Sequence, residues 1–174
     1  MKSFALVAAI VVLVGLAAFG VACKNGGGGL SLEEYFTQLD AAQNEVDRQF
    51  DEAFQLEEPG PDTSEEDIAA FARQVAEVFS TIFEDAEGTF GDIEPPAQAE
   101  EAHNALVQAI GDIRTAIDDV VDNIPDALSL EEMDAILGAP EVETASNAVD
   151  DACKELQQIA DDNSIDVDLE CEDE

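Results

Sequence analysis

The sequence lacks tryptophan and contains one tyrosine and one histidine among its 174 residues. A sugar-binding site built on stacked aromatic rings is therefore poorly supported. The histidine, His103, follows Glu100 with the Glu-x-x-His spacing of di-iron helical bundles, but such sites need a second motif and two further carboxylates. No nucleophile-elbow sequence accompanies it to form a Ser-His-Asp triad. We therefore expect no enzymatic activity and no cofactor, with His103 at the edge of a helix's apolar stripe.

Basic residues are also scarce. The chain has 6 lysines and arginines against 42 aspartates and glutamates, which gives a formal net charge of −36. A surface of this sign repels nucleic acid and anionic lipid headgroups, so we expect no nucleic-acid partner. It suits a basic protein partner and weak attraction of divalent cations. Solvation of the exterior is the simplest interpretation of the charge.

Acidic clusters keep a calcium-type cation-binding module open as the alternative function, because carboxylate oxygens are the ligands that calcium prefers. The C-terminal segment does not follow the EF-hand pattern, since Ile165 and Asp166 stand where Asp or Asn and then Gly are required. We therefore assign no residue to a metal site. The two clusters are Asp161, Asp162, Asp166, Asp168 and Glu170, and Asp118, Asp119 and Asp122.

One long apolar run is present, at residues 4–22, behind a short basic start that contains Lys2. The run ends in small residues and a cysteine, GVAC at residues 20–23, as is typical of an export signal. This arrangement resembles the lipobox of bacterial lipoproteins, with glycine where leucine is usual. In that family the cysteine is diacylated and becomes the new N-terminus. The resemblance implies a signal peptide at residues 1–22, palmitate-type acylation of Cys23 and a lipid-anchored location in the cell membrane or envelope.

Two other interpretations of the leader stay open. As a helix, residues 4–22 would rise about 28 Å, close to the thickness of a bilayer core, so the run could remain as a signal anchor. It could also be an ordinary cleaved signal. All three interpretations place the rest of the chain outside the cytoplasm, because Lys2 is the charge that stays inside. Residues 23–29 hold four consecutive glycines and are expected to form a flexible tether.

From residue 30 onward, apolar residues recur at intervals of three and four, which indicates amphipathic helices. We expect an all-α domain at residues 30–174: an up-down-up-down four-helix bundle, with a short extra helix before the last long helix and a C-terminal tail. The long helices are expected to start at Leu32 (about 26 residues), after Ser64, at Pro95-Pro96 and at Pro140. The short helix is expected at residues 129–137.

Local signals support these helix boundaries. Ser31 with Glu34, and Ser129 with Glu132, have the spacing of capping boxes. Four helices each carry one basic residue with an acid one turn away, an arrangement that favours local ion pairs worth only about 0.2–0.5 kcal/mol each. The expected pairs are Arg48 with Glu52, Arg73 with Glu77, Arg114 with Asp118, and Lys154 with Asp150.

Three cysteines are present, and lipidation of Cys23 would leave Cys153 and Cys171 as a pair in an oxidising compartment. Cys153 lies about 14 Å before the expected end of the last helix. The extended tail can span up to about 30 Å, enough to fold back to that point. We therefore predict a disulfide between Cys153 and Cys171.

Together these patterns predict a membrane-anchored extracytoplasmic lipoprotein whose specific role the residues do not name. We expect a non-enzymatic protein that works by protein contact or as an envelope component. Its expected partners are the membrane, through the N-terminal lipid anchor, and a basic protein.

Overall fold

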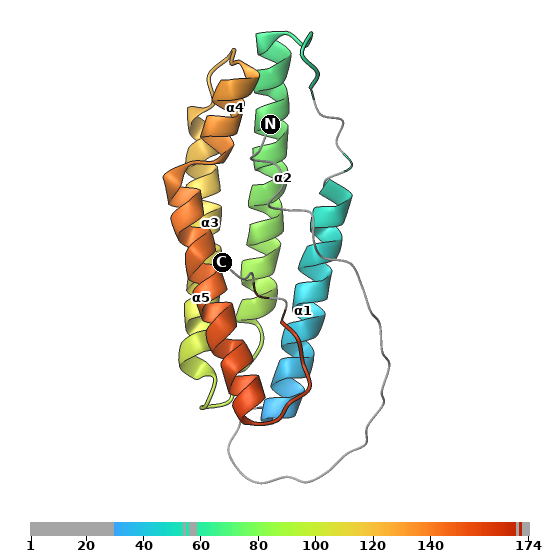
Figure 1. Ribbon diagram of the computed structural model, residues 1–174, viewed down its shortest axis with the longest axis vertical. Coiled ribbons are helices and arrows are strands. Elements are labelled where there is room, and N and C mark those ends of the chain that lie inside the picture. The colour runs from blue at the N-terminus through green and yellow to red at the C-terminus, as the bar shows by residue number, and fades with distance from the viewer. Residues whose placement is uncertain (1–29, 54, 56–58, 170, 172–174) are drawn as a thin grey trace.

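The computed structural model describes residues 30–53, 55, 59–169 and 171, and these residues form five α-helices and no β-strand. The predicted signal peptide, Cys23 and the glycine tether lie outside this range. Four long helices lie side by side in an elongated bundle, with the short helix α4 at one end (Figure 1). The all-α prediction is confirmed. The helices are α1 (Leu32–Ala53), α2 (Glu65–Gly91), α3 (Glu100–Asn123), α4 (Leu130–Leu137) and α5 (Pro140–Asp162).

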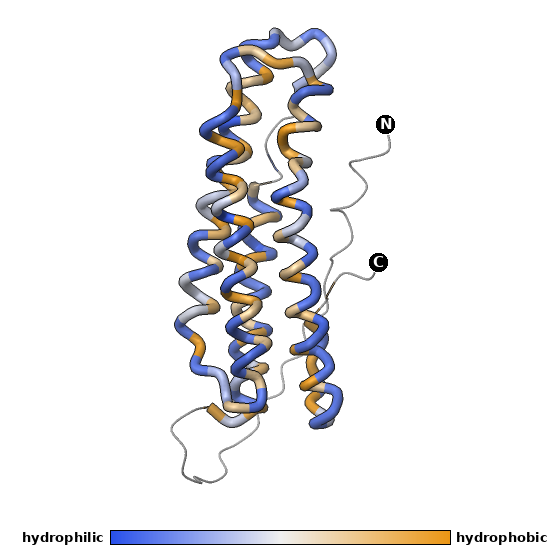
Figure 2. The backbone as a smooth tube through the Cα atoms, turned by 90° about the vertical axis from the view of Figure 1, so that its left-hand side faces the viewer, coloured by the Kyte–Doolittle hydropathy of each residue, from blue (hydrophilic) through white to orange (hydrophobic). Residues whose placement is uncertain are grey.

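Each helix places apolar and polar residues on different faces, which Figure 2 shows as short alternating segments along every helix. In α1, for example, Tyr35, Phe36, Leu39 and Ala42 are buried, whereas both acids of its first turn are exposed. Burying one large apolar side chain stabilises the fold by about 1.5–3 kcal/mol. The helices therefore associate through these stripes, and the acidic residues remain in water.

Both predicted capping boxes are present. The Ser31 hydroxyl accepts the Glu34 amide at 3.2 Å, and Glu34 accepts the Ser31 amide at 3.1 Å. At α4, Ser129 Oγ accepts the Glu132 amide at 3.3 Å, and the Glu132 carboxylate accepts the Ser129 amide at 2.8 Å. Their hydrogen bonds with the serines lower the pKa of both glutamates. At the start of α2, the Ser64 side chain accepts the Asp67 amide. Polar side chains therefore satisfy backbone amides that have no partner within the helix at these three starts.

Two predicted helix boundaries are wrong. Helix α3 begins at Glu100, not at Pro95-Pro96. The first proline is held extended by the one that follows it, and residues 97–99 form a turn in which Ala99 donates to Pro96. Helix α1 has 22 residues and is shorter than predicted, with Gln55 already in a turn.

The buried side chains form two clusters. The first, here called the aromatic core, joins the N-terminal parts of α1 and α3 to the C-terminal parts of α2 and α5. Its members are Tyr35, Phe36, Leu39, Ala42, Ala86, Phe90, Ile93, Ala99, Ala102, Leu106, Ile110, Ala152, Leu156, Ala160 and Leu169.

The second cluster, here called the aliphatic core, lies where α2 and α5 begin and α3 ends, beside α4. None of its buried members comes from the described part of α1. Helix α4 therefore covers an end of the bundle to which the described residues of α1 contribute no buried side chain. The members are Ile68, Ala69, Ala72, Ala76, Ile113, Ile117, Ile124, Leu128, Met133 and Ala145.

The basic residues only partly follow the predicted local pairing. Arg48 pairs with Glu52, as expected, and also with Glu45. Arg73 instead donates to the carbonyls of Ile124 and Pro125, at 3.0 and 2.7 Å. Arg73 also forms an ion pair with Asp126 at 3.4 Å, so this side chain of α2 binds the segment that follows α3.

Arg114 also pairs between helices and not within its own. Its Nε lies 3.1 Å from Glu87 Oε2 of α2 but makes no hydrogen bond, so the contact is an ion pair only. Asp118, its predicted partner, accepts a hydrogen bond from Ser80 of α2 at 2.5 Å. Both contacts join α3 to α2. The pairing of Lys154 with Asp150 stays a prediction.

Candidate functional site

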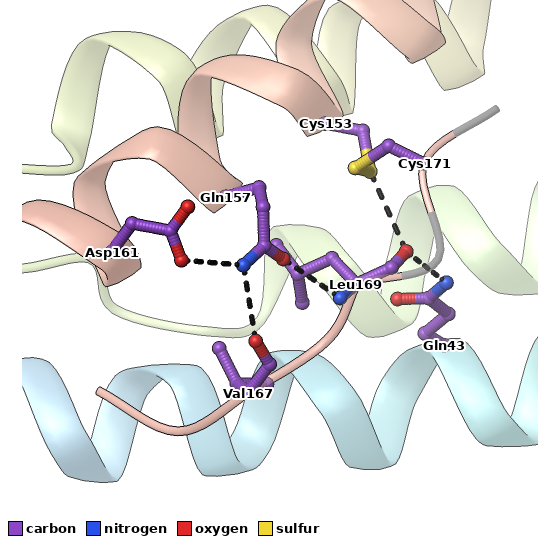
Figure 3. Close-up of a disulfide and its surroundings, with 7 residues drawn as sticks. All are labelled: Gln43, Cys153, Gln157, Asp161, Val167, Leu169 and Cys171. Atoms are coloured by element: carbon purple, nitrogen blue, oxygen red, sulfur yellow. Dashed lines mark hydrogen bonds between the residues drawn. A yellow bond between two sulfur atoms is a disulfide. The ribbon is translucent and has the colours of Figure 1, made fainter. Parts of the chain in front are cut away.

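The tail after α5 lies in the seam between α5 and α1, where Figure 3 shows it crossing between the two helices. Its reversal uses Ser164, whose φ of 57° is in the left-handed region. The Ile165 amide then donates to the carbonyl of Ala160 at 2.9 Å. The predicted disulfide is present, with Cys153 and Cys171 joined across a Cα–Cα distance of 5.7 Å.

Glutamine side chains make hydrogen bonds with the backbone of the tail. Gln157 of α5 accepts the Leu169 amide at 2.9 Å and donates to the Val167 carbonyl at 3.0 Å (Figure 3). From the other side, Gln43 of α1 donates to the Leu169 carbonyl at 2.5 Å. The Leu169 side chain is 1% exposed and belongs to the aromatic core. The tail is therefore a structural part of the bundle, and it connects α1 to α5.

An apolar cavity of about 190 Å³ lies beside this tail, within the aromatic core. Leu39, Leu106 and Leu156 form buried parts of its wall, and Leu169 of the tail closes one side. Half-buried residues from α1, α2 and α5 also line it, including Val46, Phe50, Phe83 and Val149. Apart from Gln43, the described residues of its wall are apolar or carry sulfur.

The single tyrosine and the single histidine meet in the interior. Tyr35 Oη lies 3.1 Å from His103 Nδ1, and the two side chains are 0% and 3% exposed. Burial raises the pKa of Tyr35 and lowers that of His103. The prediction of a boundary histidine is therefore wrong, because His103 takes the core position of the α3 stripe and Tyr35 satisfies its Nδ1.

The acidic clusters do not converge on a metal position in the range that the structure covers. Glu100 is exposed while His103 points inward, so this pair forms no joint site. Asp161 accepts from Gln157 at 3.0 Å, and Asp162 accepts from Gln158 at 2.9 Å. Among the described residues, no group of three or more histidine, cysteine or acidic side chains is placed to hold a metal ion. Glu170 lies outside them, and the calcium alternative stays untested.

Membrane attachment stays a prediction, because the leader lies outside the described residues. Within residues 30–53, 55, 59–169 and 171, no helix combines the length and the hydropathy needed to cross a bilayer. The chain matches no protein-family model, and neither a curated protein nor a solved structure matches it at a significant level. The candidate site is therefore described from the residues of this chain alone, without a related protein for comparison.

Sequence reasoning located the disulfide but missed the cavity and the Tyr35–His103 contact. A cavity arises where side chains from several helices fail to fill the space between them, and periodicity within one helix carries no such information. The buried contact had a weak signal, because both residues lie on apolar stripes of their helices.

Proposed function

We propose that the chain is an exported lipoprotein that holds an acidic helical domain at the outer side of a membrane. The observation that carries this proposal is the order of the N-terminal features: Lys2, the apolar run at residues 4–22, Cys23 and four glycines. The folded domain follows directly, since α1 begins at Leu32 behind its Ser31 cap. The six residues after Cys23, from Lys24 to Gly29, would give about 13 Å of clearance.

The proposed role of the domain is non-enzymatic binding of a basic protein, or a structural role in the envelope. The formal net charge of −36 supports it, because such a field attracts cationic partners over long range. Exposed acids occupy the first turns of all five helices, so the negative charge is spread over the surface.

The finer topology is also proposed: α1, α2, α3 and α5 run up, down, up and down, with α4 as an insertion. The membership of the two cores supports this order, because the beginnings of α1 and α3 share the aromatic core with the ends of α2 and α5. Short connections between consecutive helices favour antiparallel neighbours.

Intact-mass measurement of membrane-extracted protein tests the lipoprotein proposal. We expect loss of residues 1–22 and an added mass equal to acyl groups on Cys23. A Cys23→Ser variant should carry no acyl mass and should leave the membrane fraction if its signal is still cleaved. Unacylated full-length protein that retains Met1 would contradict the proposal.

Salt-dependent capture tests the partner. The immobilised full-length protein should retain a basic envelope protein at low salt and release it as screening shortens the range of the charges. A polyglutamate of similar charge is the control, because it presents the same sign without the fold. Equal capture by both would leave only non-specific attraction and would contradict a binding role.

A further inference from the structure

We infer that the cavity in the aromatic core is a binding site for a small, uncharged, apolar molecule of about the size of benzene. Its volume of about 190 Å³ provides the space. An engineered, enclosed apolar cavity of about 150 Å³ binds benzene or xenon, so the volume found here is sufficient for a molecule of that size. A whole lipid acyl chain is larger than this volume, so the geometry favours a free small molecule.

The cavity is a built part of the bundle and not an open helix face. All four long helices and the tail contribute to its wall. Its inner side consists of buried residues such as Leu39, Leu106 and Leu156, each at most 6% exposed. Half-buried side chains such as Phe50 and Val149 also line the cavity, so it is partly open to solvent.

The lining determines which ligand chemistry fits. Among the described residues of the wall, Gln43 has the only side chain with nitrogen or oxygen, and its amide already donates to the Leu169 carbonyl. None of these described residues is basic, and the net charge of −36 opposes an anion. A charged or strongly polar ligand would lose hydration here without gaining partners. An uncharged hydrocarbon has no comparable hydration to lose.

The tail supplies part of the wall. Leu169 and Cys153 both line the cavity, and the disulfide between Cys153 and Cys171 holds the tail against α5. Binding therefore depends on the tail keeping this position. It does not depend on lipidation of Cys23, because every lining residue lies between residues 39 and 169. An experiment can therefore contradict the proposed ligand site without contradicting the proposed lipid anchor, and the reverse.

Methyl NMR of the full-length chain in lipid nanodiscs tests this inference, with benzene as the probe. We expect saturable shifts of the Leu39, Leu106 and Val149 methyl signals as benzene is added. The methyl groups of Ile68 and Ile117 in the aliphatic core report on general effects of the probe and should not shift in this way. Absence of saturable shifts at the cavity methyls, up to the solubility of benzene, would overturn the inference.

A matched pair of variants tests the position. Ala86→Leu adds its side chain at the cavity wall and should weaken benzene binding by about tenfold or more, because it occupies the space of the ligand. Ala105→Leu makes the same change at an exposed position of α3 and should leave the affinity unchanged. Equal affinity of both variants would place benzene elsewhere and would overturn the assignment.

A second measurement tests the source of the ligand. Nanodiscs containing lipids with a spin label on the acyl chain should leave the cavity methyl signals sharp. Selective broadening of the Leu39 and Leu106 signals would assign the cavity to a lipid tail. That result would overturn the small-molecule inference.

Discussion

The aromatic and aliphatic cores show how one kind of sequence pattern produces two different interiors. The aromatic core contains Tyr35, Phe36 and Phe90 among its buried members, whereas the buried members of the aliphatic core are alanine, isoleucine, leucine and methionine. The cavity, the Tyr35–His103 contact and the disulfide all occur at the aromatic end.

The difference also concerns how each end is closed. At the aliphatic end, α4 and the preceding loop close the bundle, with Leu128 donating from its backbone to the Glu65 carbonyl at 3.1 Å. At the aromatic end, an extended tail closes it, held by side-chain amides and one covalent bond. The aromatic end should therefore be the part that responds to reductant and that better tolerates added side-chain volume.

The largest expected effect is that of reducing the disulfide. Cys153 and Cys171 are 18 residues apart, and opening a loop of this size should lower the free energy of unfolding by about 3 kcal/mol. Urea unfolding with and without reductant measures the change. Hydrogen exchange should increase around Leu156 more than around Ile117.

The matched control is the Cys153→Ser/Cys171→Ser double variant, whose stability should not respond to reductant. A uniform increase of exchange over both cores would remove the proposed distinction between the two ends. Two reactive thiols at Cys153 and Cys171 in the oxidised protein would show that the bridge does not form.

The next effect comes from adding the same volume to each core. Ala76→Leu in the aliphatic core should cost about 1–3 kcal/mol of stability, because overpacking forces neighbours out of place. Ala86→Leu adds its volume beside the cavity and should cost less than about 1 kcal/mol. Both alanines are on α2 and are at most 3% exposed, so urea unfolding compares them directly. Equal losses would mean that the aromatic core is as tightly filled as the other.

A smaller effect is the pH dependence that His103 contributes. Burial lowers its pKa below the ordinary value of 6.5, so the unfolded chain binds the proton more readily than the folded chain. This contribution is fully present above about pH 6.5 and is lost as the pH falls, by up to about 1.4 kcal/mol per pH unit. Urea unfolding between about pH 7.5 and pH 5.5 should show it, above the range in which most carboxylates titrate.

A His103→Gln variant should lose this part of the pH slope. A Tyr35→Phe variant should keep it, because burial is the cause of the lowered pKa. If wild type and His103→Gln have the same slope, the histidine does not remain neutral in the folded chain.

The smallest effect compares the helix caps at the two ends. Ser31→Ala and Ser129→Ala each remove a capping box, and each should cost about 1 kcal/mol in thermal or urea unfolding. The loss at Ser31 should weaken the aromatic core, where α1 contributes four buried residues. Hydrogen exchange at Leu39 and Met133 distinguishes the two locations. If either variant changed the exchange at Leu39 and at Met133 equally, the two ends of the bundle would not be independent.

The sequence predicted those features that depend on short spacing. Both capping boxes, the helix start at Pro140 and the disulfide could be predicted because each rests on a few neighbouring residues or on chain reach. The start of α3 could not, because Pro95 and Pro96 suit an extended segment as well as a first helical turn. Arg73 and Arg114 were also misassigned, because their partners lie on other segments and depend on how the helices pack.

The position of the tail has a consequence for biosynthesis. The tail follows all five helices in chain order, yet Leu169 fills the seam between the first long helix and the last. A ribosome must therefore finish every helix before this seam can close. Until then the part of the aromatic core that Leu169 covers is incomplete. Under the export proposed above, such a delay would favour passage of the unfolded polypeptide through a secretion channel, and oxidation of the two thiols would complete the domain afterwards.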